Sequence, residues 1–203
     1  MLAAVESQYA PWKYQVIVVD SGSTDGSLEY VKTLKNINLI EIPNSEFQHG
    51  RTRNLAIEQS SGEFVAFLTQ DAIPATKYWL YDLVVVLENN VAAAGVYGRH
   101  IAHDDANLYT TREMENHFSN LEKLPLFLSK YTDHEKYCDD LSWKLSLSFY
   151  SDNNSCLRKS VWMQIPYREV KYGEDQLWAR DIIDNGYSKA YSCLLYTSDA
   201  ADE

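Results

Sequence analysis

Unbroken runs of apolar residues, each about as long as a β-strand, mark the first half of the chain. Residues 14–20 (YQVIVVD) and 64–68 (FVAFL) are such runs, and Gly62 and Pro74 bound the second one. Continuous apolar runs are typical of strands that are covered on both faces, as in a parallel sheet. The pattern therefore predicts an α/β domain, with residues 64–68 as an inner strand of a mostly parallel sheet flanked by helices.

Helical spacing alternates with these runs. After the turn SGSTDGS, Leu28, Val31 and Leu34 recur at helical intervals, and Asp25 is the expected N-cap of that helix. Residues 101–146 are polar with weak periodicity, and we interpret them as helical or irregular surface. The other predicted elements are a strand over 39–42, helices over 52–60 and 78–89, a strand over 93–97, a helix over 174–185 and a strand over 188–192.

Composition is that of a globular protein. With 203 residues, 45% hydrophobic and 13% aromatic, the chain can form one domain with a buried core. A formal net charge of −11 argues against a nucleic-acid partner, because binding to a phosphate backbone needs clustered Lys and Arg. No apolar run approaches the roughly 20 residues of a membrane span and no signal peptide follows Met1, so we expect a cytoplasmic protein. Cys138, Cys156 and Cys193 have neither zinc-ligand spacing nor the pattern of a disulfide framework.

The last eleven residues, CLLYTSDAADE, do not continue the strand and helix pattern. They resemble the translation of a transposon-sequencing adapter. We therefore expect a domain over residues 1–192 and a non-native tail over 193–203, with an ordinary polar C-terminus as the alternative.

The strand over 64–68 is expected to deliver Gln70 and Asp71 to the carboxyl edge of the sheet, where open α/β sheets bind ligands. Arg51 and Arg53 lie at the start of the preceding helix. Two cations there oppose the helix dipole, which favours an anionic ligand over simple solvation. A carboxylate at Asp71 could hold the divalent ion that accompanies a diphosphate, although it could also be a turn residue before Pro74. A nucleotide-diphosphate site is the first hypothesis.

The turn after residues 14–20 is a second candidate. Asp20 could accept hydrogen bonds from a base or ribose, while Gly22 would let the backbone approach the ligand closely. A strand-to-helix turn also needs glycine and a capping aspartate for structural reasons alone. Both interpretations stay open for this motif.

Two adjacent acids, Glu174 and Asp175, begin the predicted helix over 174–185. Such acids often only complement the helix dipole, which would also keep them ionised. If the protein transfers a sugar, one of them would take the proton of an acceptor hydroxyl, a contribution of roughly 10²- to 10⁴-fold. The five histidines (His49, His100, His103, His117 and His134) show no catalytic spacing with Ser or Cys.

Taken in order, the segments IVVDSGSTDGSLE, HGRTRNLAI, SGEFVAFLTQDAIP, VYGRHI and YGEDQLWARDI resemble the family 2 glycosyltransferases of GT-A fold. Within that family they look most like bacterial rhamnosyltransferases, and the resemblance covers Leu2 to about Ser192. It implies an enzyme that transfers a sugar from a nucleotide-diphosphate donor to a hydroxyl of a glycan or lipid-linked acceptor. The subgroup favours L-rhamnose as the sugar and dTDP-rhamnose as the donor, and the anomeric configuration is expected to invert.

The resemblance also implies residue roles. Asp175 matches the catalytic base, and Asp71 takes the place of the ligand for Mg²⁺ or Mn²⁺. Arg51 and Glu174 are further candidates for a supporting role in the site. The donor would contact Asp20, Gly22, Ser23, Asp25, Arg53, Asn54, Gln70 and Asp71.

Two departures from the family pattern bear on these roles. Thr69 stands where the metal motif usually has its first aspartate, which leaves one carboxylate for the ion. The chain also begins after the family's first strand and ends before a segment that helps close the site. We therefore expect a fragment whose sheet is incomplete and partly unpaired, with its own activity left open. Membrane association, at the inner face, is expected only through an acceptor or through segments outside this chain.

Two alternatives belong to other functional classes. The same pocket could bind a sugar nucleotide or glycan without turning it over. A dinucleotide-dependent oxidoreductase is the other, because Glu41 follows the Gly-containing turn by about 20 residues. The turn SGSTDG lacks G-x-G-x-x-G spacing, so this alternative ranks below the others.

Overall fold

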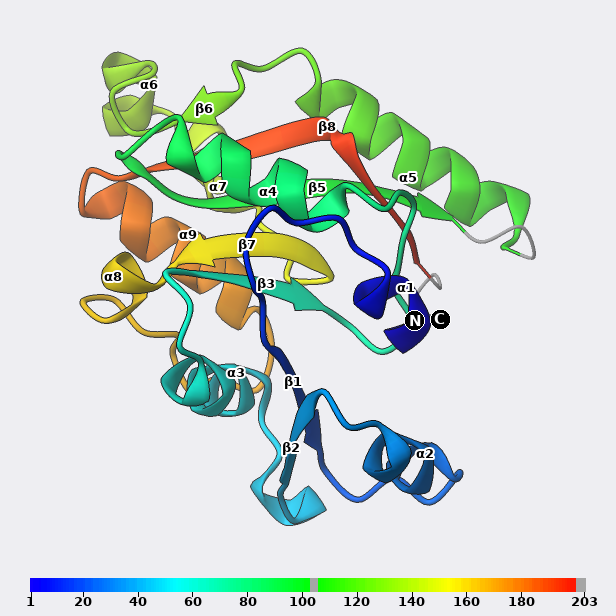
Figure 1. Ribbon diagram of the computed structural model, residues 1–203. Helices are drawn as coiled ribbons and strands as arrows, with labels where there is room; N and C mark the ends of the chain where they lie inside the picture. The colour runs from blue at the N-terminus through cyan, green and yellow to red at the C-terminus, as the bar shows by residue number, and fades with distance from the viewer. Residues whose placement is uncertain (103–105, 200–203) are drawn as a thin grey trace.

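The computed structural model describes residues 1–102 and 106–199 and contains two separate sheets. The smaller sheet pairs β1 (Val16–Asp20) with β2 (Ile37–Glu41) in parallel, and helix α2 (Ser27–Thr33) connects them. Figure 1 shows this β1–α2–β2 unit lying below the larger sheet. The expected strand, turn, helix and return strand are thus confirmed, but they form a sheet of their own.

The larger sheet has six strands and is mixed. Antiparallel pairing joins β3 (Phe64–Leu68) to β7 (Asn154–Arg158) and β7 to β5 (Ala93–Ala102), while β5 runs parallel to β8 (Ser188–Asp199). Short strands β4 (Ile73–Pro74) and β6 (Phe127–Leu128) both pair with β8. The α/β class with flanking helices is confirmed. The placement of residues 64–68 was wrong, because β3 is an edge strand with an antiparallel partner.

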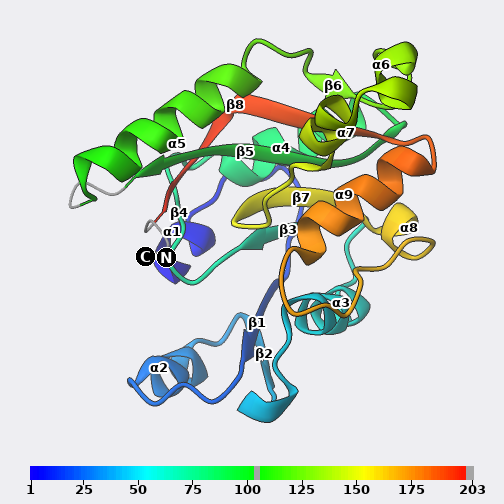
Figure 2. The same cartoon turned by 180° about the vertical axis from the view of Figure 1, so that it is seen from behind.

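Helices cover both faces of this sheet. On one face, Trp79, Leu83 and Leu87 of α4 (Trp79–Glu88) pack against Val96 and other strand residues. On the opposite face, seen in Figure 2, α9 (Glu174–Asp184) packs Trp178 and Ile182 into the main core. Remaining elements are α1 (Leu2–Glu6), the 3₁₀ turn η1 (Asn44–Glu46), α3 (His49–Gln59), α5 (Leu108–Leu121), α6 (His134–Asp139), α7 (Leu141–Ser148) and α8 (Lys159–Trp162).

Several expected boundaries were wrong. The segment over 101–146, interpreted as helical or irregular surface, holds α5, α6 and most of α7 together with β6, so its helical part is confirmed. Asp25 is not the N-cap of α2, because Gly26 occupies that position with φ 90°; Asp25 Oδ1 accepts a hydrogen bond from Ser27 N at 3.0 Å instead. Strand β8 continues past the expected end at Ser192 to Asp199. The non-native origin of residues 193–203 stays a prediction, and His103 and residues 200–203 lie outside the described residues.

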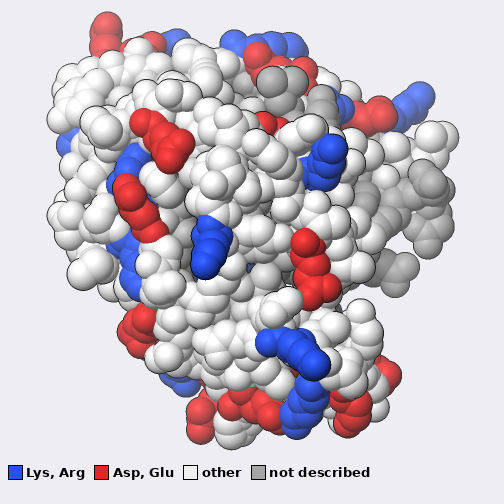
Figure 3. All heavy atoms as spheres, in the orientation of Figure 1, with Lys and Arg blue, Asp and Glu red and all other residues white. Residues whose placement is uncertain are grey.

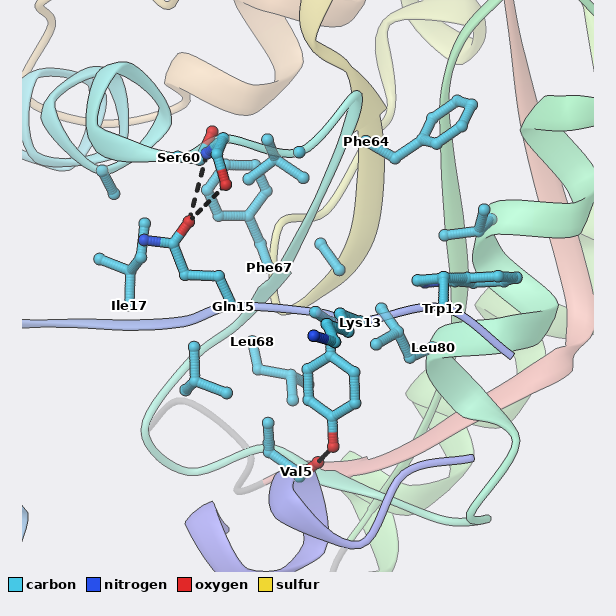
Figure 4. A pocket seen from close by; sticks show the side chains of 18 of the residues that line it. Val5, Trp12, Lys13, Gln15, Ile17, Ser60, Phe64, Phe67, Leu68 and Leu80 are labelled. Carbon is cyan, nitrogen blue, oxygen red and sulfur yellow. Dashed lines mark hydrogen bonds between the residues drawn. The ribbon is translucent and has the colours of Figure 1, made fainter. Parts of the chain in front are cut away.

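An apolar cavity of about 490 Å³ lies between the two sheets (Figure 4). It is lined by consecutive residues of β1 and β3, together with side chains of α1 and α4. Among the described strands, β1 pairs only with β2 and β3 only with β7, so each has an open edge. Gln15 Oε1 bridges the two sheets by accepting a hydrogen bond from Ser61 N at 3.2 Å. Both strands line this cavity, and the absence of a strand from the sheet stays a prediction.

Candidate active site

Helix α9 carries the two acids singled out in the sequence into the protein interior. Gly173 precedes the helix with φ 72°, a left-handed conformation that glycine adopts without steric cost. Glu174 is buried and Asp175 is half-buried, in the first turn of the helix. The predicted helix start is confirmed, and both acids face other charged groups.

Arg53 on α3 is the cation that these acids meet. Its Nε lies 3.1 Å from Asp152 Oδ2, and its Nη1 is ion-paired with Glu174 Oε1. The Arg53 side chain is only 15% exposed. Burial lowers the pKa of Arg53, but Asp152 and the other nearby acidic groups outweigh that effect and raise it overall. Arg53 is therefore permanently charged and already paired with protein carboxylates.

Asp152 is the residue that the sequence analysis missed. It lies in the turn before β7, and its side chain is 0% exposed. Its Oδ1 accepts hydrogen bonds from Ser155 Oγ at 2.7 Å and from Tyr167 OH at 3.1 Å. Its backbone N–H donates to Asp175 Oδ2 at 3.4 Å. The sequence offered no more than the polar run SDNNS, whose last two residues already belong to β7.

We refer to Arg53, Asp152, Glu174 and Asp175 as the Arg53 cluster. Burial, followed by the charge of Asp152, raises the pKa of Asp175 to about 7. Glu174 acts in the same direction, while the Gln176 N–H and Arg53 oppose the shift. The expectation that the helix dipole keeps Asp175 ionised was wrong, because desolvation and neighbouring acids exceed the dipole effect. A carboxyl that titrates near neutral pH is suited to general base catalysis.

Gly50 allows α3 to approach the segment before α9. A Cβ at this position would lie 2.2 Å from the backbone oxygen of Arg168 and 3.4 Å from Glu174 Cβ. Real side chains do not approach backbone atoms so closely, so only glycine fits. The glycine of the HGR motif therefore permits the packing that brings Arg53 to Glu174.

Asn54 and Arg51, also on α3, make contacts with the protein. Asn54 Oδ1 accepts from Trp162 Nε1 at 2.8 Å and from Tyr167 N at 3.1 Å, and its Nδ2 donates to Tyr167 O at 2.9 Å. Exposed Arg51 pairs with Glu169 at 2.8 Å. Donor contacts by Asn54 and a supporting role for Arg51 stay predictions.

Asp71 extends from the same edge of the sheet as Asp152. Leu68, the last residue of β3, pairs with Asn154, the first residue of β7, so the segments carrying the two aspartates leave the sheet together. Asp71 is half-buried and Gln70 is exposed. Within residues 1–102 and 106–199, no group of three or more His, Cys, Asp or Glu could hold a metal ion. One carboxylate fits only a cation that takes its other ligands from a substrate and water, as Mg²⁺ does.

The turn after β1 belongs to the smaller sheet. Asp20 Oδ1 accepts hydrogen bonds from the backbone N–H groups of Gly22 and Ser23, at 2.9 and 3.1 Å. The side-chain hydrogen bond with Ser23, assisted by these N–H groups, lowers the pKa of Asp20. Gly22 has φ 99°, which explains the glycine. Asp20 therefore orders its own turn, and its donor role, like those of Gly22, Ser23 and Asp25, stays a prediction.

Comparison with known proteins identifies the family. The model of glycosyl transferase family 2 matches residues 1–164. The chain belongs to this family. It is 32% identical over 181 residues to the O-antigen chain rhamnosyltransferase RfbN of Salmonella typhimurium, covering 87% of this chain and 54% of the relative. The O-antigen chain rhamnosyltransferase WbaN of Salmonella anatum is 34% identical over 181 residues, covering 87% and 53%. The chain thus spans about half the length of these curated relatives, and the expected family and subgroup are confirmed.

Solved structures share the fold. The first 349 residues of TarS from Staphylococcus aureus, in complex with UDP, match with a TM-score of 0.67 and 18% identity, covering 100% of this chain and 56% of that one. The mannosyltransferase PcManGT of Pyrobaculum calidifontis, in complex with GDP-Man and Mn²⁺, matches with a TM-score of 0.67 and 16% identity, covering 100% and 52%. These likenesses confirm the GT-A fold of this family 2 glycosyltransferase.

Two further features concern partners. On the face in Figure 3, acidic and basic side chains are interspersed, without the basic patch that a nucleic-acid surface shows. Among the described residues, no helix combines the length and apolar character needed to cross a membrane.

Proposed function

We propose that this chain is part of an enzyme that transfers a sugar, L-rhamnose, from a nucleotide-diphosphate donor to a hydroxyl of a glycan or lipid-linked acceptor. The donor favoured is dTDP-rhamnose. Similarity to two O-antigen chain rhamnosyltransferases over 87% of the chain supports this sugar and acceptor class. The proposed sugar transfer takes place on the cytoplasmic side, at the inner face of the membrane, where a lipid-linked acceptor would be accessible.

Asp175 is the proposed general base, and its position in the Arg53 cluster is the observation that carries the proposal. The acceptor oxygen attacks the anomeric carbon while its proton passes to a carboxylate oxygen of Asp175. The bond between that carbon and the phosphate oxygen breaks, and the electron pair leaves with the nucleoside diphosphate. Attack opposite the leaving group inverts the anomeric configuration. No covalent intermediate on the protein is needed.

Arg53 has a different part in this mechanism from the one that the sequence suggested. The cluster holds three carboxylates and one guanidinium, and the guanidinium already pairs with Asp152 and Glu174. A buried charge pair that loses a partner is strongly destabilised, so a diphosphate does not readily replace these acids. We propose that Arg53 holds the acids at the start of α9 rather than clamping phosphates.

The diphosphate therefore needs another source of positive charge. A divalent ion, Mg²⁺ or Mn²⁺, bound to Asp71 and to donor phosphates would supply it by stabilising the charge of the leaving group. Gln70, exposed beside Asp71, would complete this side of the donor site. Asp20, Gly22, Ser23 and Asp25 are the proposed contacts to the nucleotide.

Replacing Asp175 tests the role of the base. In the full-length protein, Asp175→Asn should lower turnover by about 10²-fold or more, because the amide cannot accept the proton. Donor affinity should change little, since Asp175 acts on the acceptor. Asp181→Asn is the matched control on the same helix, because Asp181 pairs with the exposed Arg168 at the surface. Released nucleoside diphosphate and donor binding are the two readouts, and near-normal turnover by Asp175→Asn would remove the residue from this role.

A binding module that does not turn over its ligand is the second candidate, because the chain spans about half of its relatives. Metal-dependent sugar transfer by the full-length protein would exclude it. The oxidoreductase alternative is withdrawn, because the chain belongs to glycosyl transferase family 2.

A further inference from the structure

We propose that Asp152, in the turn before β7, is a positioning residue for sugar transfer. It fixes the positions of Arg53 and Asp175 relative to each other. This inference rests on the proposed function, because its effect is exerted through the base Asp175. Asp152 itself is fully enclosed, so it acts on the reaction only through the groups that it contacts.

Asp152 connects α3 with α9 and with the segment that leads into α9. Its Oδ2 faces Arg53 of α3, and its Oδ1 accepts from Tyr167 in the segment that leads to α9. Its backbone N–H reaches Asp175 at the start of α9 itself. One residue thus touches the cation of the cluster, the segment before the helix and the proposed base.

The contacts of the side chain suit a carboxylate. Oδ1 is satisfied by two hydroxyl donors, Ser155 and Tyr167, whereas among the described residues Oδ2 faces the guanidinium of Arg53, whose Nε is 3.1 Å away. An asparagine that keeps the hydroxyl contacts through its oxygen turns its amide nitrogen toward Arg53, and two donors then oppose each other in a buried site. In the flipped orientation the hydroxyls accept from the amide and the oxygen faces Arg53, but in either orientation the negative charge opposite Arg53 is lost. Arg53 would move or lose its alignment with Glu174.

The charge of Asp152 also acts on Asp175. The charged groups that face Asp175 are Asp152 from the turn before β7, Arg53 from α3 and Glu174 from α9 itself. Loss of the Asp152 charge would leave Arg53 less neutralised, and both changes would favour ionised Asp175. The base would then be weaker, because a lower pKa means a lower affinity for the proton that it must accept.

The variant Asp152→Asn separates positioning from a purely structural role. We expect kcat to fall by about 10-fold or more while the donor KM changes by less than about 3-fold, which is the signature of an interaction that matters in the transition state. The acid limb of the pH profile should also move to lower pH. Unchanged kcat would overturn the proposal. A fall in kcat that equals the fraction of unfolded enzyme, with no shift in the acid limb of the pH profile, would also overturn it.

Tyr167→Phe keeps the test decisive if Asp152→Asn does not fold. It removes one hydrogen bond to Asp152 Oδ1 and retains the ring. The ionised form of Asp152 is then less stabilised, so kcat should fall by about 2- to 10-fold. The acid limb of the pH profile should move to lower pH, as in Asp152→Asn, but by a smaller amount. Tyr187→Phe is the matched control, because its hydroxyl contacts Gln164, outside the Arg53 cluster. A Tyr167→Phe enzyme that behaves like this control in both kcat and pH profile would overturn the inference.

Asp175→Asn distinguishes failure of this inference from failure of the proposed function. Inactive Asp175→Asn together with fully active Asp152→Asn and Tyr167→Phe would refute only the positioning role. Active Asp175→Asn would refute the proposed mechanism and the positioning role together.

Discussion

The inner strands of the larger sheet, such as β5 and β7, and strand β1 of the smaller sheet are buried to very different extents. In the larger sheet Val96, Tyr97 and Leu157 are 0% exposed, because helices cover both faces. In β1, with the sequence VIVVD, every residue is partly exposed, and in the β1–α2–β2 unit only Val31 is buried. An apolar run thus predicts a strand but not its burial, which depends on what packs against it.

The proposed functions of the two regions differ in the same way. The proposed base lies on α9, whose Trp178 and Ile182 are at the centre of the main core. The proposed nucleotide contacts lie in the turn that follows β1 of the smaller sheet. In this proposal the base lies in the well-packed region, and the contacts to the nucleotide lie in the loosely packed one.

The largest effect is expected for Trp178→Ala. Trp178 is 0% exposed, packs on Tyr150 and Tyr167, and donates its Nε1–H to Ile165 O at 2.8 Å. Losing it should lower the free energy of unfolding by about 3–5 kcal/mol, measured by urea denaturation. A cost near 1 kcal/mol would show that the region around α9 is not the better packed one.

A change in pH should alter the stability of the α9 region through Asp175. The pKa of Asp175 is about 7 in the folded protein, compared with 3.8 for an aspartate in the unfolded chain. The folded state therefore binds the proton more tightly than the unfolded state. The resulting stabilisation is complete below pH ~4 and is lost as the pH rises through ~7. Asp175→Asn should therefore become more stable relative to the wild type between pH 5 and pH 8, by on the order of 1–3 kcal/mol. A difference in unfolding free energy that does not change with pH would contradict the raised pKa.

The smallest effect is expected in the β1–α2–β2 unit. Val18 in β1 is only half-buried, so Val18→Ala should cost about 1 kcal/mol or less. Its urea denaturation, compared with that of Trp178→Ala, measures the contrast between the two regions directly. Equal costs would mean that β1 is as well packed as the main core.

Local patterns in the sequence explain which parts of the fold were predictable. The runs 14–20 and 64–68 identified strands, and Glu174 at the start of an amphipathic segment identified a helix, because these signals are contained in neighbouring residues. The partner of β3 was not predictable, because pairing with β7 depends on contacts far apart in the sequence. The long β5 and β8 were underestimated for the same reason, since pairing with each other extends both strands.

The same limit applies to the Arg53 cluster. Asp175 could be proposed from the sequence, because acids at a helix start have a recognisable pattern and here match a family motif. Asp152 was missed because its importance comes from complete burial against Arg53, which the sequence does not encode locally. The sequence analysis expected the helix dipole to keep Asp175 ionised and overlooked the raised pKa for the same reason: the dipole of α9 is a local property, whereas desolvation and the charge of Asp152 are tertiary ones.

The most direct measurement is a structure of the full-length protein with a nucleotide-diphosphate sugar and Mg²⁺. The account predicts that the diphosphate lies beside Asp71, that the anomeric carbon faces Asp175, and that Arg53 keeps its pairs with Asp152 and Glu174. A diphosphate bound directly by Arg53, with the acids of the cluster displaced, would contradict the account.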